Sequence, residues 1–325
     1  MGMSEARTTL NLRAGEWVEV RSAEEIFATL DEKGALDALP FMPEMLKYCG
    51  KRFSVFKRAH KTCDTIEKTG LRRMKNTVHL EGLRCDGEQH GGCQALCLMF
   101  WKEAWLKRVQ AGKEEEAASR SAAETAGPIF ENLMRTTRTP CEGEMAGQER
   151  YVCQVTELLK ASSPLSWWDP RQFVSDLWSR NVGLTRFLRG VLIYTFNVIQ
   201  HYRQGSTYPF NYAGQQTGKT PSEKIGIQAG EVVQIKSRDE ILETLNKNYK
   251  NRGLWFDVEM VKFCGGKYRV IRRVEKIINE KTGQMMPIPG DCLMLDGVVC
   301  EADYHLFCPR SIYPYWREIW VKRTK

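Results

Sequence analysis

The chain has 325 residues, of which 42% are hydrophobic, 27% charged and 10% aromatic, and its formal net charge is +8. This globular composition excludes wholesale disorder, collagen and coiled coil, and the length allows about two or three domains. The longest strongly apolar run, 190–199, is about half as long as a membrane-spanning helix. We therefore expect no membrane span. Segment 1–16 lacks the apolar core of a signal peptide, which predicts a cytoplasmic location.

The chain contains an internal repeat, because many segments return 215 positions later. The matching pairs include Ala14–Glu16 with Ala229–Glu231, Cys49-Gly50 with Cys264-Gly265, and Trp101–Trp105 with Trp316–Trp320. Such self-similarity is the signature of duplicated structural units. It divides the chain into a first repeat at 1–109, a connector at 110–224 and a second repeat at 225–325.

The first repeat is expected to form short strands and one inserted helix. Alternating apolar and polar residues predict a strand over 16–20. Ser22 and Glu25 have the spacing of a capping box, which predicts a short helix ending near Gly34. The Cys49-Gly50 pair predicts a turn into further strands, which we place at 53–56, 78–83 and 101–106.

The connector and the second repeat follow. The connector is expected to hold a solvated helix or linker at 110–127, helices at 149–159, 170–180 and 184–202, and a loop at 203–221. The second repeat is expected to form strands at 231–235, 268–271, 292–299 and 316–321, with a capping box at Ser237. We therefore predict an α+β protein in which two duplicated small SH3-like β-barrels are joined by a helical connector.

Both repeats carry the pattern Cys-x4-His-x2-Cys and a Cys-Gly turn. Zinc takes four tetrahedral ligands, and thiolates and imidazoles on turns present them well. One predicted set is Cys49, Cys85, His90 and Cys93, and the other is Cys264, Cys300, His305 and Cys308. The alternative is that these are buried apolar cysteines and surface histidines inherited by duplication.

The first repeat has three further potential ligands, His60, Cys63 and Cys97, which the second repeat lacks. Any special chemistry is therefore expected in the first repeat. The thiols of Cys63, Cys85, Cys93 and Cys97 suit zinc or an iron–sulfur cluster. Three ligands with an open position would suit a catalytic metal, whereas a fuller set would be a structural zinc site.

Two basic strands interleave cations with aromatic residues, at 51–58 and 267–273. Small barrels present such faces to single-stranded nucleic acid, which they bind by stacking and phosphate contacts. The candidate nucleic-acid-binding residues are Lys57, Arg58, Arg272 and Arg273. The alternative is an ordinary solvated face of a half-buried strand.

The repeated ends, His90–Trp105 and Cys308–Trp320, resemble motifs of an uncharacterised bacterial family with duplicated Cys/His- and Trp-rich repeats. The resemblance would cover both repeats and implies no activity or cofactor. From the residues we predict a cytosolic metal-binding protein with a zinc or iron site in the first repeat, compatible with a metalloenzyme acting on a small substrate. The alternative is a nucleic-acid or protein-binding module with structural zinc.

Overall fold

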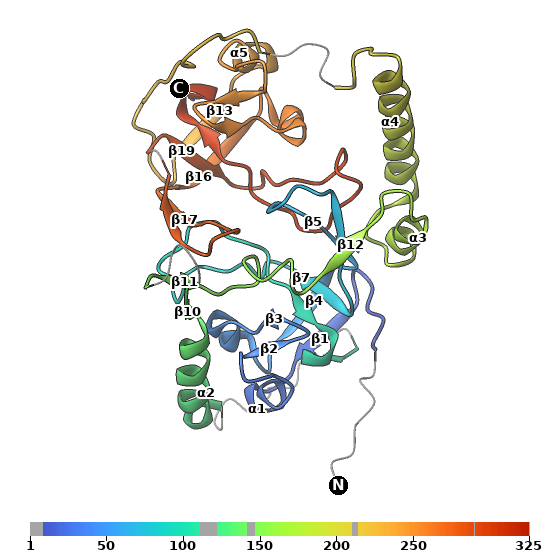
Figure 1. Cartoon of the computed structure of the whole chain (residues 1–325), viewed down its shortest axis with the longest axis vertical. Helices are drawn as coiled ribbons and strands as arrows, with labels where there is room; N and C mark the ends of the chain where they lie inside the picture. Colours follow the sequence, from blue (N-terminus) through green and yellow to red (C-terminus); the bar gives the residue numbers. More distant parts are fainter. Residues whose placement is uncertain (1–8, 111–121, 142–146, 210–213, 289, 325) are drawn as a thin grey trace. The chain divides into compact units, whose positions relative to one another are not determined.

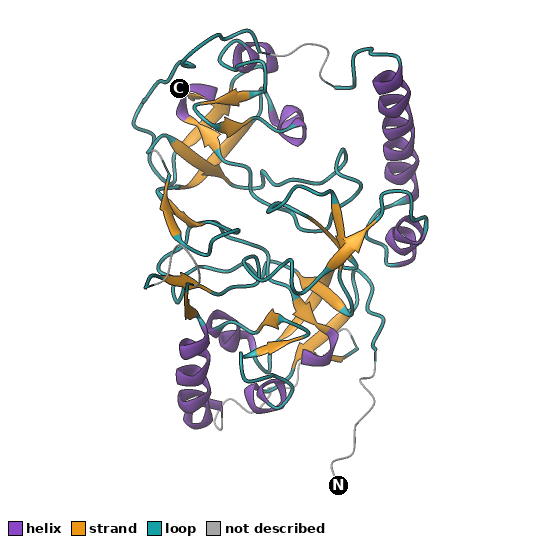
Figure 2. Cartoon of the chain, in the orientation of Figure 1, coloured by secondary structure: helices purple, strands orange, loops and turns teal. Residues whose placement is uncertain are grey.

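The computed structural model of the chain describes residues 9–110, 122–141, 147–209, 214–288 and 290–324 (Figure 1). The chain forms two units. The first consists of 1–182, 277–286 and 308–310, and the second of 183–276, 287–307 and 311–325. Both units mix helices with short strands (Figure 2), which confirms the mixed helix and strand class. The predicted connector does not form a third unit, because its residues are divided between the two.

The first unit contains a five-stranded antiparallel sheet. Its order is β8 (Trp101–Lys102), β7 (Thr77–Leu80), β4 (Arg52–Arg58), β1 (Trp17–Val20) and β9 (Leu106–Arg108). A 3-10 turn, η2 (Glu103–Trp105), divides the last predicted strand into β8 and β9. No pairing joins β8 to β9 in the described part of the chain, so the sheet is open. The prediction of a closed barrel is therefore wrong.

The second unit contains a sheet of the same order. It runs β20 (Trp316–Arg317), β19 (Cys292–Leu295), β16 (Lys267–Arg273), β13 (Val232–Ile235) and β21 (Val321–Arg323), with η5 (Glu318–Trp320) before the last strand. Trp17 lies opposite Ser54 in the first sheet, and Val232 lies opposite Arg269 in the second. This second sheet is open as well, since its described strands leave β20 and β21 unpaired with each other.

The first helix of each unit begins at the predicted capping box. In α1 (Ala23–Phe27), the backbone N–H of Glu25 donates to Ser22 Oγ at 3.2 Å, and Ser22 N–H donates to a Glu25 carboxylate oxygen at 3.0 Å. Ser237 caps α5 (Arg238–Leu242) in the same way. Both predicted caps are confirmed. They depend on residues three positions apart, so the local sequence determines them.

Two further 3-10 helices, η1 (Pro43–Tyr48) and η4 (Val258–Phe263), end at the predicted Cys-Gly turns. Gly50 has φ +72° and Gly265 has φ +80°. These values lie in the left-handed region that favours glycine because it has no Cβ. The turns lead directly into β4 and β16, and so they place each 3-10 helix beside its sheet.

Three longer helices come from the segment predicted as the connector. They are α2 (Ala122–Thr136) and α3 (Arg171–Trp178) in the first unit and α4 (Leu184–Tyr202) in the second. The helices predicted at 170–180 and 184–202 are confirmed. The part of the predicted helix or linker at 111–121 lies outside the described residues. No described helix, α4 included, combines the length and the apolarity needed to cross a membrane.

The predicted helix at 149–159 is wrong. β11 (Glu149–Tyr151) pairs with β10 (Arg138–Pro140), and turns follow it. The reason is a long-range tether. The side chain of Gln154 accepts from the backbone N–H of Phe100 and donates to its carbonyl, both at 2.8 Å. These bonds fix Gln154 beside Phe100, while local backbone bonds such as Glu157 N–H to the Cys153 carbonyl form isolated turns and not a continuous helix.

Short strand pairs complete both units. They are β2 (Ala35–Leu36) with β3 (Leu39–Pro40), β6 (Leu71–Arg73) with β5 (Lys61–Cys63) and β12 (Ser163–Leu165), β14 (Lys250–Asn251) with β15 (Leu254–Trp255), and β17 (Lys276–Ile278) with β18 (Met285–Pro287). The turn between β17 and β18 belongs to the first unit, where Gly283 accepts a 2.8 Å hydrogen bond from Tyr151 N–H.

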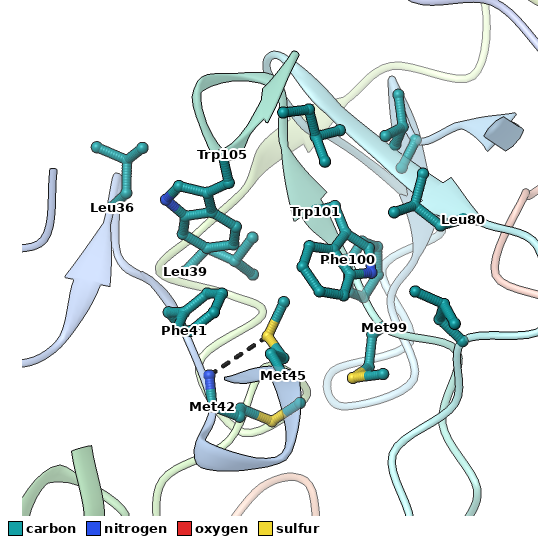
Figure 3. Close-up of a cluster of buried hydrophobic side chains, with 14 of the residues drawn as sticks. Leu36, Leu39, Phe41, Met42, Met45, Leu80, Met99, Phe100, Trp101 and Trp105 are labelled. Atoms are coloured by element: carbon teal, nitrogen blue, oxygen red, sulfur yellow. Dashed lines mark hydrogen bonds between the residues drawn. The ribbon is translucent and has the colours of Figure 1, made fainter. Parts of the chain in front are cut away.

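The cores of the two units are built on the same aromatic arrangement. In the first unit, Phe41 packs edge-on against Trp101 and Trp105 at ring distances of 6.3 and 5.2 Å (Figure 3). Both tryptophans are fully buried. In the second unit, Phe256 packs in the same way against Trp316 and Trp320. Edge-to-face pairs stabilise a core beyond the effect of area burial alone.

Candidate metal centre

Glu44, Cys85 and His90 form a buried group in the first unit. Glu44 lies on η1, and the other two lie in the loop that follows β7. One ligand atom from each lies within 4.8 Å of the others, and no other trio of histidine, cysteine or acidic residues does so among the described residues. Glu44 is 5% exposed and His90 is 1% exposed. Carboxylate, thiolate and imidazole are the donors that zinc accepts in proteins.

The loop that carries Cys85 and His90 is compact. The backbone N–H groups of His90 and Gly92 both donate to the Gly87 carbonyl, at 3.0 and 2.9 Å. Gly87 has φ +75°, and a Cβ there would collide with the backbone of Cys93. Only glycine fits this position without displacing the loop. The loop therefore fixes where the His90 ring and the Cys85 thiol enter the group.

The hydrogen bonds of His90 identify its ligand atom. Its Nε2 lies 3.0 Å from the carbonyl oxygen of Val152, which only accepts, so Nε2 carries a proton. Its Nδ1 lies 2.6 Å from Glu44 Oε1. Metal-bound histidines commonly donate their second ring N–H to a carbonyl, which fixes the ring. The ring of His90 thus directs Nδ1 toward Glu44, with which it makes a hydrogen bond in this structure.

The two carboxylate oxygens of Glu44 differ in their contacts, because Oε1 accepts from Gln89 N–H at 3.1 Å and contacts His90 Nδ1. The second oxygen of Glu44, Oε2, is buried and has no hydrogen-bond partner among the described residues. Burial raises the pKa of the Cys85 thiol well above its usual value, and the nearby Glu44 carboxylate raises it further. A buried carboxylate without a full set of partners is costly. A cation held between these atoms would remove that cost.

The second unit has the same residue types in the matching positions, but its histidine is engaged elsewhere. Glu259, Cys300 and His305 stand 215 residues after the first group. His305 Nε2 lies 3.0 and 3.1 Å from the two oxygens of Asp257. The first unit has Met42 at the position of Asp257, so it offers no such competing carboxylate. Among the described residues, only the first unit forms such a group.

The structure places the other predicted ligands in several locations. Cys49 and Cys264 end the 3-10 helices, where burial raises the pKa of each thiol to about 12. Cys97 is a core thiol whose carbonyl accepts from Cys85 N–H at 2.9 Å. Cys93 Sγ accepts from Ile278 N–H at 3.3 Å. The structure therefore does not bring Cys49 or Cys93 into the group with Cys85 and His90.

The extra ligands predicted in the first repeat are also separated. His60 Nε2 lies 3.2 Å from Asp176 Oδ1. Cys63 contacts Cys308, whose sulfur lies 3.1 Å from its own. Cys308 therefore does not join Cys264, Cys300 and His305 in a second site, nor does Cys63 join Cys85 in a four-thiolate cluster. The predicted sets assumed that each repeat keeps its own ligands, but Cys308 belongs to the first unit.

Two of the four predicted nucleic-acid-binding residues serve as internal ion-pair partners. Arg58 donates to Glu103 at 2.7 Å, and that glutamate is 1% exposed. Glu103 also accepts from the backbone N–H groups of Asn11 and Leu12. In the second unit, Arg273 pairs in the same way with the fully buried Glu318. Lys57 and Arg272 lie at the matching strand irregularities of β4 and β16.

Replacing Arg58 with methionine is expected to lower the free energy of unfolding by about 3 kcal/mol, because the buried Glu103 charge loses its partner. The matched control is Lys51→Met on the exposed start of the same segment, with an expected change within about 0.5 kcal/mol. Urea unfolding of both variants measures the difference. If both variants lost the same small amount of unfolding free energy, a structural role for Arg58 would be contradicted.

Sequence reasoning found Cys85 and His90 but missed Glu44. The sequence does contain a pattern that points to Glu44, because Glu44-Met45 recurs as Glu259-Met260 in the second repeat. In addition, Glu44 interrupts the apolar segment 39–46. A carboxylate within such a segment is buried with it, and buried charges are paired or bind metals. Ligand searches restricted to cysteine and histidine overlook this kind of donor.

The chain matches no protein-family model, no curated protein and no solved structure. The functional interpretation therefore depends on the geometry of the described residues.

Proposed function

We propose that the first unit binds one zinc ion through Glu44, Cys85 and His90, and that this ion has a structural role. The observation that carries the proposal is that three different metal donors, of which Glu44 and His90 are buried and Cys85 is partly buried, lie within 4.8 Å of one another. The proposal is supported by the unpartnered Oε2 of Glu44 and by the orientation of the His90 ring.

The donor set favours zinc over an iron–sulfur cluster. Iron–sulfur clusters are held by several cysteine thiolates, and this group has one. Zinc accepts carboxylate, thiolate and imidazole together, at bond lengths of about 2.0–2.3 Å. Such bonds place tetrahedral ligand atoms roughly 3.3–3.8 Å apart. The ligand atoms lie within 4.8 Å of one another, and His90 Nδ1 and Glu44 Oε1 are 2.6 Å apart, so zinc binding would separate these two atoms or use Glu44 Oε2.

The burial of the group favours a structural role over a catalytic one. A catalytic zinc keeps a position open to water or substrate. Three protein ligands leave the fourth position of a tetrahedral zinc to water. Glu44 and His90 are almost fully covered and Cys85 is partly covered, so we propose that this position admits water and not a larger substrate. A bound ion would instead fasten the 85–93 loop to η1. The chain is thus proposed to be a metal-stabilised binding module and not a metalloenzyme. The basic residues Lys57 and Arg272 remain candidates for contacts with nucleic acid.

The experiment that tests the proposal compares matched variants in the two units. Protein purified without added metal is expected to contain about one zinc ion per chain. Glu44→Gln is expected to weaken zinc binding by about 100-fold in competition with a chromophoric chelator, since a direct ligand matters at least as much as its hydrogen-bond partners. Glu259→Gln, at the matching position, is expected to bind like the wild type. Equal affinities for both variants would overturn the assignment.

We further propose that residues 1–109 and 225–325 arose by duplication of one open sheet. The two sheets share strand order, and pairs such as Trp17–Ser54 and Val232–Arg269 differ in number by 215 at both ends. The shared capping boxes at Ser22 and Ser237 support the same origin. After duplication, the difference between Met42 and Asp257 would have left metal binding in one copy.

A further inference from the structure

Two cysteine side chains lie in contact in the first unit, outside the proposed metal centre. Cys63 ends β5, and Cys308 begins the short segment 308–310 that belongs to this unit. Their sulfur atoms are 3.1 Å apart, and the backbone N–H of Cys63 also donates to Cys308 Sγ at 3.1 Å. A disulfide bond is about 2.05 Å long, so the two sulfurs need to approach by only about 1 Å.

Arg310 places a buried positive charge beside this pair. It is 4% exposed, and its guanidinium donates to Thr65 Oγ1 at 2.7 Å and to the Cys63 carbonyl at 3.4 Å. Its second nitrogen is held by Glu280 at 2.9 Å. A guanidinium fixed in this way stabilises a thiolate nearby.

The surroundings of Cys308 favour its thiolate. Burial alone raises the pKa of Cys308, but the hydrogen bond from Cys63 and the backbone and charge of Arg310 lower it to about 6. The buried Lys61 ammonium also interacts with this thiol. The carboxylates in contact with these two cations are Glu280, which faces Arg310, and Asp176, which faces Lys61, and Arg310 also interacts with the Cys97 thiol. At neutral pH the pair is thus poised as a Cys63 thiol that donates to a Cys308 thiolate.

We propose that Cys63 and Cys308 form a redox-active dithiol that low-molecular-weight disulfides oxidise to an intramolecular disulfide. Cys63 is half-buried and Cys308 is 2% exposed, so an external reagent reaches Cys63 first. The two sulfurs meet in the folded chain although they are 245 residues apart in the sequence. The inference does not depend on the metal centre, since neither cysteine belongs to the metal-binding group.

The reaction is balanced in two exchange steps. First, the Cys63 sulfur attacks one sulfur of the external disulfide and transfers its proton to the Cys308 thiolate. A mixed disulfide forms on Cys63, and one external thiolate leaves. Second, the Cys308 sulfur attacks Cys63 Sγ, and the second external thiol leaves with the proton. The two protein sulfurs are oxidised by two electrons, and the external disulfide is reduced to two thiols.

Peptide mapping of the full-length protein after incubation with oxidised glutathione tests the proposal. The wild type is expected to yield a Cys63–Cys308 disulfide peptide and little glutathione adduct. Cys308→Ser removes the resolving thiol, so it is expected to retain about tenfold more glutathione on Cys63. Cys63→Ser is expected to leave Cys308 unmodified, because that thiol is buried. Cys292→Ser, which removes a buried thiol of the second unit, is expected to behave as the wild type.

Two results would overturn the proposal. One is a glutathione adduct on Cys63 that persists in the wild type as much as in Cys308→Ser. The other is a result in which both thiols stay unmodified by glutathione, with or without a chelator. If the thiols react only after a chelator is added, the pair binds a metal ion and the dithiol proposal is likewise overturned. The wild-type map alone decides the question if a variant fails to fold. Loss of zinc in Glu44→Gln leaves the expected result unchanged, so the two proposals are tested separately.

Discussion

Chelation of the metal ion is expected to lower the Tm of the first unit by about 10 °C. A ligand present at about 1,000 times its Kd stabilises the folded state by about 4 kcal/mol. For a domain of 150–250 residues, each kcal/mol corresponds to about 2–4 °C. The expected loss is concentrated in the 85–93 loop, because Cys85 and His90 connect that loop to Glu44 on η1. Differential scanning calorimetry with and without chelator measures the shift.

The two matching histidines provide the control for this result. His90→Ala is expected to have the low Tm already and to be insensitive to chelator. His305→Ala is expected to respond to chelator as the wild type does, because Asp257 holds His305. A wild-type Tm that chelation leaves unchanged would mean that no metal stabilises the first unit.

The second large effect is expected at a buried ion pair between β5 and α3. Lys61 Nζ lies 2.6 Å from Asp176 Oδ2, and both side chains are fully buried. Burial lowers the pKa of Lys61, and the Asp176 charge partly offsets this effect. Asp176→Ala removes the carboxylate that pairs with this buried ammonium. We expect the free energy of unfolding to fall by about 3–5 kcal/mol.

Two further variants isolate the cause of that loss. The double variant Lys61→Met with Asp176→Leu removes both charges, and its stability is expected to be within about 1 kcal/mol of the wild type or above it. Arg171→Ala removes an exposed arginine from its pair with Asp169, which Arg73 still contacts, and its expected cost is below about 1 kcal/mol. Urea unfolding measures all three variants. If Asp176→Ala lost no more unfolding free energy than Arg171→Ala, other groups would compensate the buried charge of Lys61.

The parts of the fold that depend on neighbouring residues were predictable from the sequence. The capping boxes at Ser22 and Ser237 and the helix at 184–202 follow from local spacing and periodicity. Closure of a barrel depends on pairing between distant strands, and no local pattern encodes it. The predicted helix at 149–159 failed for a similar reason, since Gln154 bonds to Phe100 across the fold.

The candidate site was predictable in part. The recurrence of Cys85 and His90 as Cys300 and His305 singled out two of its three members. Glu44 was missed because acidic residues are common and its burial is a tertiary property. The contact of Cys63 with Cys308 joins cysteines from different repeats, so a comparison within each repeat had no means of finding it.

Anomalous diffraction at the zinc absorption edge, from crystals grown without added metal, would locate the proposed ion itself. The account predicts one strong anomalous peak in the first unit, bonded to Glu44, Cys85 Sγ and His90 Nδ1 at about 2.0–2.3 Å. It predicts no peak at the matching position of the second unit, where His305 pairs with Asp257. A first unit without a peak, or a peak bound by other residues, would contradict the account.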